Sequence, residues 1–482
     1  MSTPPITLIR NLDWLVAWDV AASAHVYMRG ADLAFAGDSI VHAGPRFTGV
    51  AATTIDGAGL MASPGFVNVH AHPSSEPGNK GVLEELGSPA LGQSSLYEYM
   101  PIFRLEPEAA EAATQVAIWE LLKSGVTTFC DLSGARDGWA DQIAATGIRA
   151  VLCPMFRAAG WSTSNGHSVE YSWDEAAGER GLAQALEVID AAARHPSGRL
   201  GGMMGPSQID TCGAGLLRES LAEARKRGIP TQLHAAQSLV EFNEITRRHG
   251  KTPIEWLDAN ELLGPDMIVG HGIFLNDHPQ LHWPHADDFG RLARSGAQVA
   301  HCPTVFARRG IALNTLGRYV EAGIVCGIGT DTFPHNYLDE LRLAAYAARI
   351  VSGNFRAART DQVFDAATIG GARMIRRPDL GRLAVGAKAD FFLAETGHPA
   401  MRPLRDPLRS LIYSAGDRAV RDVYVAGVQV VRDGAVPGID IEAAHARLQE
   451  AQDRSLGSTA ARDWARRDVD TMSPRVYRLS ER

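Results

Sequence analysis

Cysteine is scarce in this sequence of 482 residues, which contains five cysteines and no CxxC pair. A disulfide framework or a cysteine-rich metal knuckle is therefore not expected, and a reducing cytoplasm is the expected location. No stretch approaches the roughly 18 uninterrupted apolar residues that a membrane-spanning helix needs. The N-terminus also has no basic segment followed by an apolar core and a small-residue cleavage site, so no secretory signal is expected.

A basic run is also missing, and the formal net charge is −8, from 47 basic and 55 acidic residues. Nucleic acid and anionic membranes are poor partners for such a chain, and a small-molecule substrate is the expected one. Hydrophobic residues make up 45% of the chain, with 48 glycines and 25 prolines, which is an ordinary globular composition. The chain is long enough to bury a large core.

Short apolar runs broken by glycine and aspartate occur at both ends of the chain, a pattern typical of β-hairpins. We expect residues 1–63 and 379–440 to form the two halves of one small β-sandwich. The remaining tail, residues 441–482, is charged and has a helical pattern, so we expect it to pack on the surface or on a partner subunit.

Residues 64–378 alternate apolar runs with amphipathic segments of helix length, such as 108–124, 215–227 and 337–352. Eight β-then-α units in succession predict an α/β fold of the (β/α)8 TIM barrel type. The eight runs are, in order, GFVNVHAH, VTTFCDL, IRAVLCP, LGGMMGPSQI, PTQLHAA, MIVGHGIF, AQVAHCP and IVCGIGTD.

Polar residues end several of these runs, where the active site of such a barrel lies. They are His70, His72, His234, His271, His301 and Asp331. Residues i and i+2 of a strand point the same way, so His70 and His72 can hold one ion together. Three imidazoles and a carboxylate suit a borderline divalent ion with one position left for water. Zn²⁺ is the expected ion, and Fe²⁺, Co²⁺ and Mn²⁺ are alternatives.

Each of these residues also has a plainer interpretation. A single histidine at a strand end is commonly a hydrogen-bonded polar residue and not a ligand, and Asp331 could cap the helix that contains NYLDELRLAAYAA. The recurrence of histidine at the ends of successive predicted strands favours the metal site.

The segments PGFVNVHAHP, QLHAAQS, IVGHGIF, VAHCPT, GIGTD and GRLAVGAKADFFL together resemble the amidohydrolase superfamily. The chain looks similar to the branch that includes cytosine, guanine and S-adenosylhomocysteine deaminases and triazine or phenylurea hydrolases. The resemblance implies that His70, His72, His234 and Asp331 bind the metal and that His271 lies beside it. It also implies a homodimer or higher homo-oligomer.

In two-metal members of that superfamily a carboxylated lysine ends the fourth strand. Here that strand contains no lysine, so a single ion is expected. The ion would lower the pKa of its water from about 15.7 toward about 7. Asp331 is then the expected general base, and His271 would stabilise charge that develops on the attacked group.

Gln237 departs from the deaminase pattern, which has a proton-carrying glutamate at this position. A glutamine can form hydrogen bonds but holds no acidic proton. We therefore expect a hydrolase of a non-peptide C–N bond in an amide, urea or carbamate. The alternative is a deaminase or dechlorinase of a purine, pyrimidine, pterin or triazine ring. Glu241, four residues on, could serve as the acid while Gln237 orients a loop.

Further substrate contacts are expected from side chains near the strand ends. These are Gln237, Glu241, His167, Tyr97, Met100 and Arg308. The segment 74–101 is long and rich in glycine and serine, which is typical of a lid or binding loop. The histidines 278, 282 and 285 follow no ligand spacing and predict a solvated surface loop. A metal-stabilised binding protein without turnover is a further alternative, which the complete ligand set disfavours.

Overall fold

The computed structural model describes residues 4–82, 87–281, 283–314 and 316–480. Four of the predicted central strands form one parallel sheet in the order β13-β10-β9-β8, and β14 also pairs with β10. Their bounds are β8 (Phe66–Ala71), β9 (Val126–Ser133), β10 (Arg149–Phe156), β13 (Leu200–Gly202) and β14 (Gly205–Pro206). The fourth predicted strand is thus two short pieces.

The other four central strands form a second parallel sheet in the order β15-β16-β17-β18. These are β15 (Thr231–Ala235), β16 (Met267–His271), β17 (Gln298–His301) and β18 (Cys326–Ile328). Isolated parallel bridges join the two sheets, from Met204 to Thr231 and Gln208 to His234 at one edge, and from Ala71 to Asp331 at the other. The strand ends that carry the polar residues therefore lie together.

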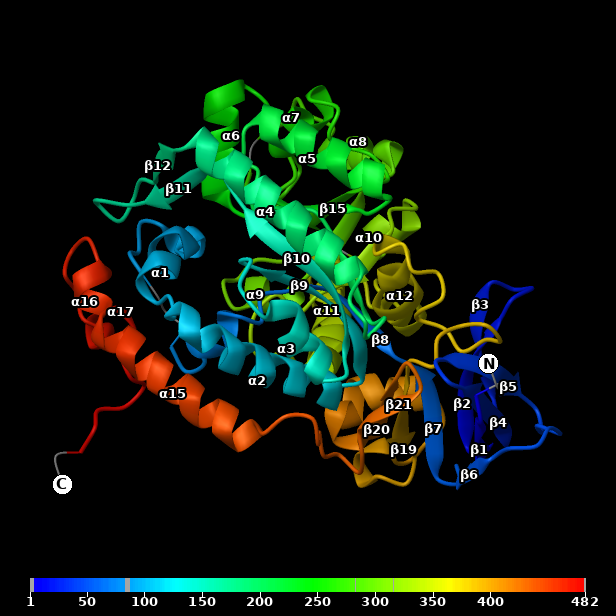
Figure 1. The fold of residues 1–482 in the computed structure, drawn as a ribbon. Coiled ribbons are helices and arrows are strands. Elements are labelled where there is room, and N and C mark those ends of the chain that lie inside the picture. The colour runs from blue at the N-terminus through cyan, green and yellow to red at the C-terminus, as the bar shows by residue number, and fades with distance from the viewer. Residues whose placement is uncertain (1–3, 83–86, 282, 315, 481–482) are drawn as a thin grey trace.

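Helices surround these strands (Figure 1), as the amphipathic pattern predicts. The main ones are α2 (Ala110–Lys123), α4 (Glu175–Ala193), α5 (Ala214–Arg227), α6 (Leu239–His249), α7 (Pro253–Ala259), α8 (Asp288–Ser295) and α11 (Tyr337–Ser352). Local sequence signals determine where α6 begins and ends. The side chain of Ser238 accepts a hydrogen bond from the backbone N–H of Glu241 at the start of the helix. Gly250 ends the helix with a left-handed φ of 64°.

Two further sheets lie outside the central strands. The sheet with strand order β21-β20-β19-β7-β2-β3 contains strands from both sides of the central region, and the sheet β5-β4-β1-β6 comes from the first part of the chain alone. The strands from the first part of the chain are β1 (Ile6–Leu12), β2 (Trp14–Asp19), β3 (Ala24–Met28), β4 (Ala31–Ala36), β5 (Ser39–Gly44), β6 (Thr53–Asp56) and β7 (Leu60–Pro64). Those from the last part are β19 (Phe391–Glu395), β20 (Val420–Val425) and β21 (Val428–Val431). A shared apolar cluster includes Leu15, Leu33 and Phe391.

The tail contains α15 (Ile441–Gly457), α16 (Thr459–Arg462) and α17 (Val469–Met472). Helix α15 packs along α2, where Ala444 and Leu448 join Ala112 and Val116 in one apolar cluster. The tail thus lies against this chain's own barrel (Figure 1).

Two expectations about loops need correction. The segment 74–101 is not an open loop over its described length, because it contains two short 3₁₀ turns and most of α1 (Leu96–Ile102), in which Leu96, Tyr97, Tyr99 and Ile102 are buried. His278 is buried, and its ring contacts Phe274 at 4.5 Å between centroids. His285 is exposed, and His282 lies outside the described residues. In the described part of the chain, no helix is long and apolar enough to cross a membrane.

Candidate metal centre and active site

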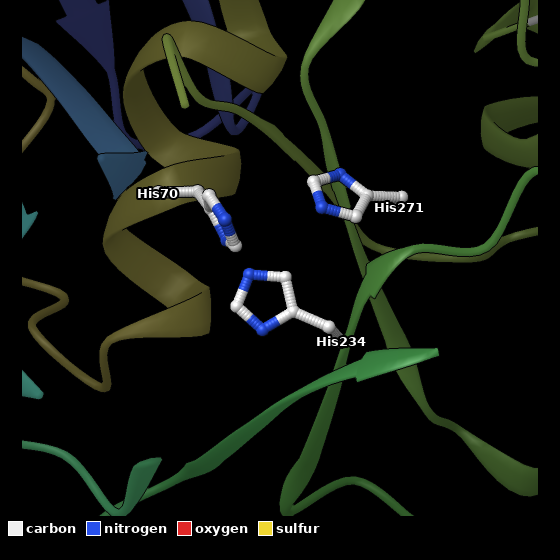
Figure 2. Close-up of side chains that lie close together, drawn as sticks. All are labelled: His70, His234 and His271. Carbon is white, nitrogen blue, oxygen red and sulfur yellow. The ribbon is translucent and has the colours of Figure 1, made fainter. Parts of the chain in front are cut away.

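Four histidines from three strand ends converge on one point. Figure 2 shows the imidazoles of His70, His234 and His271 facing one another. Their ring centroids lie 4.8 Å apart for His70 and His234, and 4.9 Å apart for His70 and His271. His72 joins the group, with its Nε2 atom 3.2 Å from the Nε2 atom of His234. The alternation of side chains along β8 brings His70 and His72 to the same side, as expected.

Asp331 completes the group, three residues after β18. Its Oδ1 atom lies 3.7 Å from Nε2 of His70 and 3.4 Å from Nε2 of His72, and its Oδ2 atom lies 3.6 Å from Nε2 of His271. Backbone hydrogen bonds of 2.9 Å, from Asp331 to His70 and from His72 to Asp331, hold this segment against β8.

Two residues of the centre have left-handed backbone conformations that are rare for residues other than glycine. The φ angles are 89° at His271 and 60° at Asp331. Such conformations cost on the order of 1–3 kcal/mol each and cluster at functional sites. The surrounding structure therefore stabilises a geometry that the local sequence disfavours.

The outer ring nitrogens of three histidines bond to oxygen atoms. Nδ1 of His72 donates to the carbonyl of Leu132 at 2.8 Å, and Nδ1 of His234 donates to the carbonyl of Ser207 at 2.6 Å. Nδ1 of His70 contacts Oε1 of Gln232. Because a carbonyl oxygen only accepts, each Nδ1 carries the proton and each neutral ring presents the Nε2 lone pair to the centre, as metal-binding histidines do.

Burial keeps the imidazoles of His70, His234 and His271 neutral. It lowers the pKa of His70 to about 3 and holds the pKa values of His234 and His271 well below the usual range, and the neighbouring histidines reinforce each shift. Neutral imidazole is the form that binds a metal ion.

These residues fit a divalent ion. Nε2 of His70 is buried and makes no hydrogen bond within the described part of the chain, as expected of a nitrogen that awaits a ligand. Ligand atoms of His70, His234 and His271 lie within 4.8 Å of one another, and so do those of His70, Cys302 and Asp331. Burial raises the pKa of the Cys302 thiol well above its usual range, so the nitrogen and carboxylate set is the better match.

A cavity of about 140 Å³ opens beside the centre. Of the predicted substrate contacts, Gln237 and Met100 line it. Tyr99 of the predicted binding loop 74–101 also lines it, and so does Arg309, which follows the seventh predicted strand. The side chains that sequence reasoning missed are Ser75, Glu76, Leu96, Met155, Arg157, Trp161, Ser207, Gln208, Val305, Phe306 and Thr332. A second cavity of about 380 Å³ adjoins it, since Ser75, Glu76, Tyr99 and Met100 line both.

Four predicted contacts are not among the described residues that line the inner cavity. His167 is exposed in the turn between β11 (Ala159–Ser162) and β12 (Glu170–Trp173). Arg308 turns to the backbone carbonyl of Phe333, and the next residue, Arg309, reaches the cavity and the hydroxyl of Tyr99.

Tyr97 and Glu241 are buried in a separate polar group. The hydroxyl of Tyr97 donates to Oδ2 of Asp210 at 2.7 Å, and the carboxylate of Glu241 accepts from the backbone N–H of Ala236 at 2.5 Å. Glu241 lies on α6 close to Gln237, as the four-residue spacing predicts. Its carboxylate, however, turns back to the chain between β15 and α6.

Comparisons with known proteins identify the family of the chain. The amidohydrolase family model matches residues 61–430. The chain belongs to the amidohydrolase family. It is accordingly an enzyme, a hydrolase that acts on carbon–nitrogen bonds other than peptide bonds, and its fold is α/β of the TIM-barrel type.

Among curated relatives of this amidohydrolase, a 5-methylthioadenosine/S-adenosylhomocysteine deaminase of Thermococcus kodakarensis is 28% identical over 82% of this chain and 88% of its own length. A 5'-deoxyadenosine deaminase of Methanosarcina acetivorans is 26% identical over 77% of this chain and 81% of its own.

Two solved structures show the same fold at lower identity. An adenosine deaminase from Xanthomonas campestris with bound zinc has a TM-score of 0.80 at 23% identity and covers 94% of this chain and 99% of its own. A triazine hydrolase from Arthrobacter aurescens has a TM-score of 0.77 at 22% identity and covers 93% and 99%. The curated deaminases favour the ring deaminase alternative over the amide, urea or carbamate hydrolase that Gln237 suggests.

Proposed function

We propose that this amidohydrolase displaces an amino group, or a comparable leaving group such as chloride, from a carbon of a nitrogen heteroaromatic ring. The observation that carries the proposal is the group of His70, His72, His234, His271 and Asp331 beside a cavity, in a chain whose curated relatives are deaminases.

The histidines His70, His72 and His234 and the carboxylate of Asp331 would hold one divalent ion, with Zn²⁺ as the first candidate. When bound, that ion supplies a water whose pKa is lowered from about 15.7 toward about 7. Asp331 takes the proton of the attacking water and returns it to the leaving group, because its two oxygens already reach across the centre. His271 stabilises the charge that develops on the attacked ring.

Gln237 would hydrogen-bond the substrate ring from the cavity wall and orient it for attack. Its amide both donates and accepts, so it can match a ring nitrogen and an exocyclic group. It cannot deliver a proton, and that task falls to Asp331.

The inner cavity is too small for a whole nucleoside-sized substrate. Pockets that enclose drug-sized ligands measure about 300–1,000 Å³, against about 140 Å³ here. The reacting ring would occupy the inner cavity, and its substituent would extend into the adjoining cavity of about 380 Å³, past Tyr99 and Met100.

A second candidate is hydrolysis of an amide, urea or carbamate. One observation favours it: Gln237 lines the cavity where ring deaminases have a glutamate. Such a reaction needs no protonation of a ring nitrogen, and Asp331 alone could protonate the departing nitrogen.

We also propose the finer points of the architecture. The bridges at both sheet edges support a closed eight-stranded barrel over residues 64–378, and the two outer sheets support a β-sandwich built from residues 1–63 and 379–440. A homodimer in the cytoplasm remains a prediction.

A panel of compounds tests the function. The metal-loaded enzyme would be assayed on adenosine analogues, aminopyrimidines, aminotriazines and chlorotriazines, and on anilides, aryl carbamates and aryl ureas. We expect ammonia or chloride release from at least one ring compound. Turnover of an anilide, carbamate or urea with no release from any ring compound would favour the second candidate and refute the first.

A further inference from the structure

Two carboxyl groups, Asp210 and Glu241, are buried next to the turn that carries Gln237. The exposed fraction of each residue is 0%. Neither lines the inner cavity among the described residues, and neither has a role in the mechanism above. Burying a carboxylate is expensive unless a cation or several hydrogen bonds compensate it.

Glu241 fixes the turn between β15 and α6. Its Oε1 atom accepts a hydrogen bond of 2.5 Å from the backbone N–H of Ala236, and its Oε2 atom accepts one of 3.5 Å from that of Gln237. Ala236 has a left-handed φ of 55°, a conformation that an alanine adopts only where its surroundings enforce it. The carboxylate therefore acts as the anchor of the short segment from which Gln237 reaches the cavity.

Asp210 accepts hydrogen bonds from two tyrosine hydroxyls. Its Oδ2 atom accepts from Tyr97 at 2.7 Å and from Tyr171 at 2.8 Å, while its Oδ1 atom is buried and makes no hydrogen bond in the described part of the chain. Among the described residues, no side-chain ion pair involves Asp210 or Glu241. Arg248 is near, but its guanidinium donates to the backbone carbonyl of Asp210.

Burial and mutual repulsion affect the pKa values of the two carboxyl groups. Burial raises the pKa of Glu241, and repulsion by Asp210 raises it further; burial raises the pKa of Asp210 as well. The other ionisable groups that face them are Tyr97 of α1, Tyr171 of β12, Arg248 of α6, Arg157 after β10 and Cys212 before α5. Without a paired cation, two neighbouring buried carboxyl groups do not both ionise at low cost.

We propose that Asp210 and Glu241 share one proton at neutral pH, and that Glu241 is a positioning residue that holds Gln237 toward the substrate cavity through the backbone. The positioning role of Glu241 rests on the proposed function, since it requires that the cavity binds the substrate. The shared proton does not depend on the proposed function.

The shared proton is tested by the pH dependence of unfolding. A carboxyl group whose pKa is raised in the folded state stabilises the protein fully below its unfolded pKa, near 4, and this contribution is lost as the pH rises through the folded pKa. Burial alone also raises the pKa of Glu241, so both carboxyl groups must be removed to remove the proton. The metal-loaded wild type should therefore take up about one more proton on folding, between pH 5 and 8, than the double variant Asp210→Asn/Glu241→Gln. The control Asp190→Asn, at a partly exposed residue paired with Arg227, should match the wild type. Equal proton uptake in the double variant and the wild type, or a difference of about two protons, would refute the shared proton.

The positioning role is tested with Glu241→Gln, which keeps the shape of the side chain but replaces one acceptor oxygen with a donor. We expect KM to rise about 10-fold, the equivalent of one hydrogen bond to a charged group, with a smaller change in kcat and an unchanged metal content. Glu223→Gln, at a partly exposed ion pair on α5 away from the cavity, is the matched control. A wild-type KM in Glu241→Gln would overturn this role.

Asp210→Asn distinguishes the backbone contacts of Glu241 from the effect of the neighbouring charge. It is also the variant to use if Glu241→Gln does not fold. It leaves both backbone contacts of Glu241 in place, so KM should stay within about two-fold of the wild type. A rise of about 10-fold in Asp210→Asn would overturn the positioning role. If the wild type is inactive on every panel compound, the proposed function is refuted instead. The measurement of proton uptake would still test the shared proton.

Discussion

The cavity has two contrasting walls. On the wall formed by β8 and the segment after β18, the imidazoles of His70 and His72 have their outer nitrogens hydrogen-bonded and their inner nitrogens turned to Asp331. At the end of β15, a neutral amide, Gln237, faces the cavity, and the carboxyl groups of Glu241 and Asp210 lie buried apart from it. We propose that the groups of the first wall bind a metal and move a proton. We propose that the buried carboxyl groups of the second wall hold the position of Gln237 and do not contact the substrate.

Asp331→Asn removes the carboxylate of the first wall, and we expect it to have the largest effect on turnover. Loss of the general base is expected to lower kcat by about 10²–10⁴-fold. The measurement is steady-state turnover at saturating metal with the most active panel compound, with the partly exposed Asp190→Asn as control. A kcat within two-fold of the wild type would contradict the assignment of Asp331.

Tyr97→Phe would weaken the second wall without touching the cavity. It removes a buried hydrogen bond to Asp210, so we expect the free energy of unfolding to fall by about 1–3 kcal/mol. Chemical denaturation measures the change, and Tyr346→Phe, at a partly exposed tyrosine, should leave stability unchanged. Equal stabilities of Tyr97→Phe and Tyr346→Phe would show that the hydrogen bond contributes nothing.

Gln237→Glu would make the second wall resemble that of ring deaminases, with the smallest expected effect. A third carboxyl group next to Glu241 is repelled and poorly solvated, so we expect kcat/KM to fall several-fold. Gln237→Ala is the companion variant, which removes the amide without adding charge. A several-fold increase for Gln237→Glu would show that the site needs an acid there and that the amide is not the functional group.

The central strands and the convergence of polar side chains at their ends were predictable because both repeat a simple rule. Every predicted central strand is present, and the polar residues at their ends meet because parallel strands end at one face. His70 and His72 follow from the two-residue period of a strand, and no tertiary information is needed to pair them.

The cavity wall was less predictable because loops and side-chain directions decide it. Glu76 comes only four residues after His72, yet nothing in its local pattern says that it turns inward. Tyr97 was expected in the cavity, but a buried carboxylate 113 residues away, Asp210, takes its hydroxyl. Such a contact depends on packing between distant segments, which composition and periodicity do not encode.

The metal content of the purified enzyme tests the central claim most directly. Elemental analysis of the wild type and of His234→Ala, after dialysis against a trace of mixed divalent ions, would count the ions per chain. We expect about one ion per wild-type chain and loss of most of it, together with turnover, in His234→Ala. An active wild type without a stoichiometric ion, or a His234→Ala variant with full metal and full activity, would contradict the account.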